Sequence, residues 1–206
     1  TAMLDASAIE VDALDLHLTN TTLPATLSMA LGPWQEAIKQ RNLTLVINVP
    51  QDFPELEIDV QRVAQAIGNI ISNAIKYTPD SGQISIDAQV TQDGEHFEII
   101  IADTGIGIDH QNHAMIFEKF FRVGNLLLHS TGDTKFKGAG PGLGLHIARG
   151  VVEAHGGKIW VESEGYDEER CPGSAFHIRL PIKAHPTKKS TWEEEERLLQ
   201  TPPEQV

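Results

Sequence analysis

Hydrophobic and polar positions follow two periods along the chain, and these periods predict strands and helices in a regular order. Alternating apolar positions predict five strands at residues 43–49, 83–90, 96–103, 158–165 and 174–182. Helical spacing predicts helices at residues 24–42, 59–77 and 142–155, with a further short helix at 113–121. The triplet Gln92-Asp93-Gly94 is typical of a tight hairpin turn. Hairpin-joined strands beside three helices indicate an α+β fold, a two-layer sandwich whose mixed, mostly antiparallel sheet of about five strands packs on three helices.

Chain length and composition favour one well-cored domain. The chain has 206 residues, of which 40% are hydrophobic, which fits a single domain with a short attachment. We expect the domain to span residues 16–183, with residues 1–15 as the trailing end of a preceding helix. Residues 184–206 are polar and acidic, and we expect a flexible tail there. Because the chain starts at Thr1 rather than Met, we expect it to derive from a longer protein.

Charge and cysteine content exclude several function classes. A formal net charge of −13 argues against a nucleic-acid partner, since binding of phosphate backbones depends on clustered Lys and Arg. Cys171 is the only cysteine, so neither a disulfide within the chain nor a thiolate metal site is available. No apolar run reaches the roughly 18 residues of a membrane span, and no signal peptide opens the chain. We therefore expect a cytoplasmic domain, whose parent protein is free to carry a membrane anchor.

The helix predicted at 59–77 carries polar side chains opposite its apolar stripe. At about 100° per residue, Asn69, Asn73 and Lys76 share one column on the side away from that stripe. The stripe itself comprises Val60, Val63, Ala64, Ile67, Ile70, Ile71 and Ala74. Asn is a poor helix former, and an amide oxygen suits Mg²⁺ that takes its other ligands from water and phosphates. The column is thus a candidate metal and phosphate site, although for Lys76 taken alone a solvated position is the better interpretation.

A carboxylate and two glycines follow the strand predicted at 96–103. Asp103, Gly105 and Gly107 lie in the segment DTGIGI, residues 103–108. Glycine permits close approach of the backbone to a flat ring, and a carboxylate only accepts hydrogen bonds, which favours the amino group of adenine. The alternative is that Asp103 caps a turn.

The segment GAGPGLGL places Gly138, Gly140, Gly142 and Gly144 at alternate positions before a predicted helix. Free N–H groups at a helix N-terminus and the helix dipole together attract anions. The order of residues matches neither a P-loop nor a Rossmann fingerprint. The other interpretation is a flexible hinge with close helix packing.

Taken in order, these segments resemble the ATP-binding catalytic domain of sensor histidine kinases. That domain belongs to the GHKL superfamily, which has the Bergerat ATP-binding fold and includes type II topoisomerases, mismatch-repair ATPases and heat-shock chaperones. The resemblance covers the N box at 69–79, the first glycine box at 103–108, the F box at 116–123 and the second glycine box at 140–145. Four motifs in order across the chain are far more specific than any one of them.

The resemblance implies a role for each matching position. It implies ATP and Mg²⁺ as ligands, Asn73 and Asn69 as metal ligands, and Asn73, Lys76 and Arg122 as the catalytic set. It further implies an ATP lid at residues 122–139. The implied nucleotide-binding residues are Asn69, Asn73, Lys76, Tyr77, Asp103, Gly105, Gly107, Ile108, Phe121, Gly140, Gly142, Leu143, Gly144 and Leu145.

One position separates kinases from hydrolases in this superfamily, and a second feature departs from a complete histidine kinase. ATP-hydrolysing members carry a glutamate one turn before the ligand Asn, and here that position is Asn69. An amide cannot take a proton from water, which favours transfer of the phosphoryl group to an external nucleophile. None of the nine histidines is followed by an acidic residue, the pattern that the resemblance implies for a phosphoacceptor. We therefore expect this chain to bind ATP without phosphorylating itself.

The expected partners are a histidine-bearing dimerisation domain of the same kinase and a response regulator. The chain itself is expected to be monomeric, and the parent protein a homodimer. An apolar triplet, Leu126-Leu127-Leu128, lies in the expected lid; it either folds back on its own domain or docks on the missing helices. Two other functions stay open: a serine kinase of the anti-sigma type, and a non-catalytic ATP-sensing module.

Overall fold

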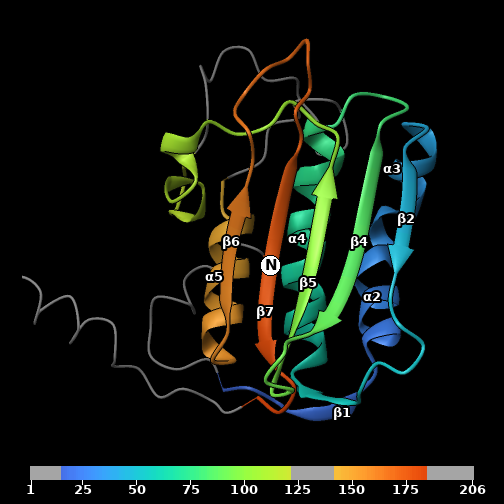
Figure 1. Cartoon of the computed structure of the whole chain (residues 1–206), viewed down its shortest axis with the longest axis vertical. Helices are drawn as coiled ribbons and strands as arrows, with labels where there is room; N and C mark the ends of the chain where they lie inside the picture. Colours follow the sequence, from blue (N-terminus) through green and yellow to red (C-terminus); the bar gives the residue numbers. More distant parts are fainter. Residues whose placement is uncertain (1–14, 122–141, 185–206) are drawn as a thin grey trace, which may run out of the picture.

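The computed structural model describes residues 15–121 and 142–184 and places one five-stranded sheet in front of a helical layer (Figure 1). The strand order is β2-β4-β5-β7-β6, with β2 and β4 parallel and the other three neighbouring pairs antiparallel. The strands are β2 (Thr44–Asn48), β4 (Gln83–Val90), β5 (His96–Asp103), β6 (Lys158–Glu162) and β7 (Ser174–Pro181). This arrangement confirms the predicted α+β sandwich.

The helical layer consists of α2 (Leu23–Leu31), α3 (Gln35–Gln40), α4 (Val60–Tyr77) and α5 (Gly144–Ala154). The Gly32-Pro33 step divides the first predicted helix into two, with a 3-10 turn at Gly32–Trp34 between them. Helix α4 lies centrally behind β5 and β7, and α5 lies behind β6 (Figure 1). Because α2 and α5 both pack on α4, α4 also buries Ala66, Ser72 and Ile75, which lie outside its predicted stripe.

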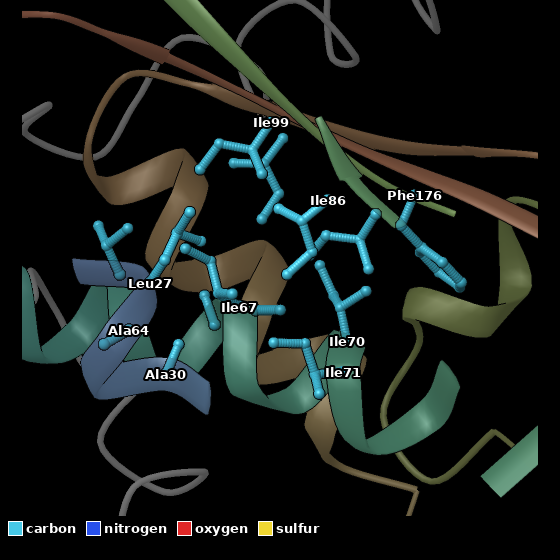
Figure 2. Packing of buried hydrophobic residues seen from close by; sticks show 14 of the residues in the cluster. Leu27, Ala30, Ala64, Ile67, Ile70, Ile71, Ile86, Ile99 and Phe176 are labelled. Carbon is cyan, nitrogen blue, oxygen red and sulfur yellow. The ribbon is translucent and has the colours of Figure 1, made fainter. Parts of the chain in front are cut away.

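One hydrophobic core fills the space between the sheet and the helices. Ile67, Ile70 and Ile71 of α4 point toward Ile86 of β4 and Ile99 of β5 in Figure 2. All five side chains are fully buried, as expected for alternate positions on half-buried strands and one face of a helix. The core thereby fixes α4 against the strand that ends at Asp103.

Some local structure differs from the sequence prediction. The chain forms a small antiparallel ribbon of β1 (Thr19–Thr21) and β3 (Leu56–Ile58), which at three residues each are too short to show a period. The short helix predicted at 113–121 is wrong: two 3-10 turns, at His110–Asn112 and Met115–Phe117, take its place. The last helix begins at Gly144 rather than Gly142.

Candidate functional site

The C-terminal end of α4 and the turn after β5 are joined by their backbones. The N–H of Ile106 donates to the carbonyl of Tyr77 at 3.1 Å. A Cβ on Gly105 would lie 2.5 Å from that carbonyl oxygen and from Oδ1 of Asp103, so no larger residue fits at this crossing. The first glycine box therefore lies against the end of the N-box helix.

The carboxyl group of Asp103 is half-buried at the end of β5. Its Oδ1 accepts a hydrogen bond from the N–H of Gly105 at 2.8 Å. Burial raises the pKa of this carboxyl to about 7, against the effect of backbone N–H donors from Gly105 and Ser174. Burial without a cationic partner is costly for a carboxylate, and such a shifted group is a candidate for recognition of a ligand.

Asn69 connects the middle of α4 to the first turn of α5. Its Nδ2 donates to the carbonyl oxygen of Gly144 at 3.0 Å, and its Oδ1 can act only as an acceptor. A Cβ on Gly144 would lie 3.5 Å from Cβ of Asn69, so α5 begins directly beside this side chain. Asn73, one turn further along α4, is half-buried. The amide oxygens of Asn69, beside the start of α5, and of Asn73, one turn further along α4, are of the ligand type that Mg²⁺ takes together with phosphates.

A backbone hydrogen bond joins the F box to the second glycine box just before α5 begins. The N–H of Phe120 donates to the carbonyl of Gly142 at 3.1 Å, which brings the F box beside the second glycine box. Leu143 is buried, and Phe121 and Leu145 pack against the core. The described binding residues predicted in the two boxes, Phe121 and Gly142 to Leu145, thus lie near one another at the start of α5.

The end of the N-box helix carries Lys76 and Tyr77. Lys76 is 9% exposed and Tyr77 is 37% exposed, so the solvated position considered for Lys76 is wrong. Both side chains have interaction partners.

Arg41 is a residue of the site that the sequence did not reveal. Its guanidinium donates to the carbonyls of Ile75 and Thr78, at 2.8 and 2.7 Å, and forms an ion pair with Asp80. A cation at a helix C-terminus satisfies carbonyls that have no partner within the helix. Arg41 therefore fixes the end of α4, where Lys76 and Tyr77 lie.

The loop between β6 and β7 lies against the first glycine box. Gly107, at a φ of +73°, forms a bridge with Tyr166, and a Cβ there would collide with the carbonyl oxygen of Gly165. The N–H of Ile108 donates to Oγ of Ser163 at 3.0 Å. No sequence pattern pointed to Ser163 or to this loop.

The remaining predicted residues lie outside the described part of the chain. They are Arg122, Gly138, Gly140 and the Leu126–Leu128 triplet. Within residues 15–121 and 142–184, the structure brings together the N box, the first glycine box and the start of α5 at one end of the domain.

A family model described as "Histidine kinase-, DNA gyrase B-, and HSP90-like ATPase" matches residues 58–184. The chain belongs to this family. Among curated relatives, it is 34% identical over 182 residues to the adaptive-response sensory kinase SasA of Rippkaea orientalis, covering 88% of this chain and 43% of that protein. It is also 34% identical over 160 residues to the sensor histidine kinase WalK of Bacillus subtilis, covering 77% of this chain and 24% of WalK.

Two solved structures have the same fold as this chain. Full-length ShkA in complex with AMPPNP superposes with a TM-score of 0.72 at 23% identity, over 90% of this chain and 35% of that one. Histidine kinase ThkA in complex with response regulator protein TrrA gives a TM-score of 0.63 at 23% identity, over 81% and 42%. The chain is thus an ATP-binding domain of the sensor histidine kinase type and spans less than half the length of the two relatives compared.

Across residues 15–121 and 142–184, no helix has both the length and the apolar character needed to cross a membrane.

Proposed function

We propose that this domain binds Mg·ATP and presents its γ-phosphate to a histidine on a separate helical domain of the parent protein. Asp103 accepts a hydrogen bond from the adenine amino group in this proposal, and Gly105 and Gly107 shape the base pocket. Asn73 and Asn69 hold Mg²⁺, which neutralises phosphate charge. Lys76, Tyr77, Ile108 and Phe121 line the nucleotide, and Arg122 and residues 140–145 face its phosphates.

The Asn69–Gly144 hydrogen bond is the observation that carries the choice of transfer over hydrolysis. Asn69 occupies the position where a hydrolase would need a general base, and its Nδ2 is a donor to Gly144. An amide in this arrangement accepts no proton from water. Catalysis therefore depends on positioning and charge neutralisation, and the nucleophile comes from another domain.

The parent protein supplies the other partners in this proposal. The acceptor histidine lies on a dimerisation domain, so the full-length protein is a homodimer, and a response regulator receives the phosphoryl group. We place the domain in the cytoplasm, where ATP is available.

The decisive experiment supplies the histidine-bearing helical domain of the parent protein in trans. With ATP labelled at the γ-phosphate and with Mg²⁺, we expect acid-labile phosphate on that domain and none on this chain. N73A removes a proposed metal ligand and should lower the labelling rate at least ~100-fold, since even indirect partners of a metal site contribute about 10–100-fold.

N48A provides the matched control, because it removes the same amide from β2, where Asn48 bonds Asp87 at 2.8 Å on the edge of the sheet. We expect N48A to label at the wild-type rate. Acid-stable phosphate on a serine of a protein substrate would instead support the anti-sigma type of kinase. ATP binding without transfer to any acceptor would support a sensing module, and equal rates for N73A and wild type would exclude the proposed metal site.

A further inference from the structure

The β6–β7 loop, residues 163–173, supports the first glycine box along its whole length. The N–H of Gly173 donates to the carbonyl of Gly105, and the N–H of Asp167 donates to the carbonyl of Ile106, both at 2.8 Å. The bridge between Gly107 and Tyr166 continues this contact. The turn that carries Asp103 is therefore held on one side by α4 and on the other by this loop.

The Ser163 side chain also joins the loop to the first glycine box. Its Oγ accepts the N–H of Ile108 at 3.0 Å and donates to the carbonyl of Gly173 at 2.6 Å, with the carbonyl of Gly165 at 3.2 Å. A serine hydroxyl has one hydrogen to donate, and here that hydrogen is directed at carbonyls of the loop. The hydroxyl thus joins three backbone segments and has no donor left for a ligand.

The turn packs tightly against Ser163 and Gly165 at Gly107. A Cβ on Gly107 would lie 3.0 Å from Oγ of Ser163 and collide with the carbonyl oxygen of Gly165. Ser163 is half-buried, so the lost hydrogen bonds of a truncated side chain would be replaced only in part by water. Ser163 therefore adds a side-chain hydrogen bond at Ile108 to the backbone bonds that position the turn.

We propose that Ser163 is a positioning residue for recognition of the base, acting through the N–H of Ile108 and the turn that follows Asp103. This inference rests on the proposed function, since it concerns the base end of the same nucleotide site. A displaced turn changes the pocket around the base and leaves the start of α5 in place, because α5 is held by Asn69.

The test compares binding of ATP, ADP and GTP by wild type, S163A and S85A in calorimetric titrations with Mg²⁺. ATP and ADP share the base and differ only in the γ-phosphate, so we expect S163A to weaken both by the same factor, about tenfold, as for loss of about one buried hydrogen bond. We also expect a smaller preference for ATP over GTP. A serine that merely stabilised the fold would leave that preference unchanged.

Ser85 is the matched control, because it is half-buried on β4 of the same sheet, and S85A should bind all three nucleotides as the wild type does. S163T, which keeps the hydroxyl, should restore affinity and preference. If S163A does not fold, S163C takes its place. We then expect smaller losses of ATP and ADP affinity and a smaller decrease in the preference for ATP over GTP.

Three results overturn the inference alone: wild-type binding by S163A, an unchanged preference for ATP over GTP, or a loss confined to ATP, which would place the effect at the phosphate end. A wild-type chain that binds no ATP would reject the proposed function together with this inference.

Discussion

Asp103 combines a half-buried carboxyl with a predicted role as an acceptor for adenine. Its pKa is raised to about 7 by burial, so the folded state binds the proton more tightly than the unfolded state. The stability that this proton contributes is fully present below the unfolded pKa of about 3.9 and is lost as pH rises through about 7. The charged carboxylate, which is the form assumed in the proposed hydrogen bond from adenine, therefore costs the fold stability at neutral pH.

D103N should separate these two effects. At pH 8 we expect the variant to be more stable than wild type by about 1–2 kcal/mol, because an uncharged amide replaces a half-buried carboxylate. Urea unfolding at pH 8, pH 5 and pH 3 measures this: the gain should be smaller at pH 5 than at pH 8 and disappear below the unfolded pKa of about 3.9. ATP binding should be lost in the same variant. A D103N protein that binds ATP normally would remove Asp103 from the base pocket.

At the scale of elements, His155 connects the beginning of α4 to the end of α5. Its Nε2 accepts the N–H of Asp59 at 3.1 Å, and its Nδ1 donates to the carbonyl of Val151 at 2.7 Å. Asp59 in turn caps α4 by accepting the N–H of Arg62 at 3.2 Å. Burial lowers the pKa of His155, which fits a neutral ring that donates from one nitrogen and accepts at the other.

Protonation of His155 should weaken this connection. Its stabilising contribution is fully present above the unfolded pKa of about 6.5 and is lost as pH falls below it, because the unfolded state then binds the proton more tightly. We expect H155A to lower the free energy of unfolding by about 3 kcal/mol at pH 7. The variant should also lose less stability between pH 7 and pH 5 than wild type.

Chemical denaturation across that pH range measures both effects. H110A is the control, since His110 is exposed and the same truncation there should leave the profile unchanged. Identical pH profiles of H155A and wild type would show that another group accounts for the acid sensitivity.

At the scale of the whole molecule, the proposed nucleotide would join segments that are far apart in the chain. The N box, the turn after β5 and the start of α5 span residues 69 to 145, and a ligand that binds only the folded state stabilises all of them together. We expect ATP with Mg²⁺ at 100 times its Kd to add about 2.7 kcal/mol to the free energy of unfolding.

For a domain of this size the gain corresponds to an increase in Tm of roughly 5–10 °C in thermal unfolding. The N73A protein should show no such shift with Mg·ATP. An equal shift in N73A would mean that the nucleotide binds elsewhere on the molecule.

Much of the sheet and the helical layer was predictable because it depends on local periodicity. Alternation in residues 83–90 and 96–103 predicted β4, β5 and the hairpin between them, and the structure confirms all three. The stripe of α4 is buried as predicted, except that Val60 is only partly buried. The ribbon of β1 and β3 was missed because three residues carry no measurable period, and it forms by pairing across the fold.

The residues of the candidate site likewise fall into two groups, those that the local sequence indicates and those that only the fold reveals. Asn69 and Asn73 were selected as candidates because Asn is a poor helix former, and Asp103 because two glycines follow it at the end of a strand. Arg41 and Ser163 were not, since serine or arginine at a strand or helix end is ordinary by itself. Their partners lie 34 and 55 residues away, so only the fold shows that they have one.

The sequence by itself determined which faces of the strands and helices are apolar, the motifs in order and the absence of a general base at Asn69. These properties depend on neighbours within a few residues. Only the tertiary structure decided that β2 pairs parallel to β4, that Asn69 bonds the first turn of α5 and that the β6–β7 loop holds the glycine turn. The physical reason is that core packing selects among many possible long-range pairings, each of which satisfies the same local pattern.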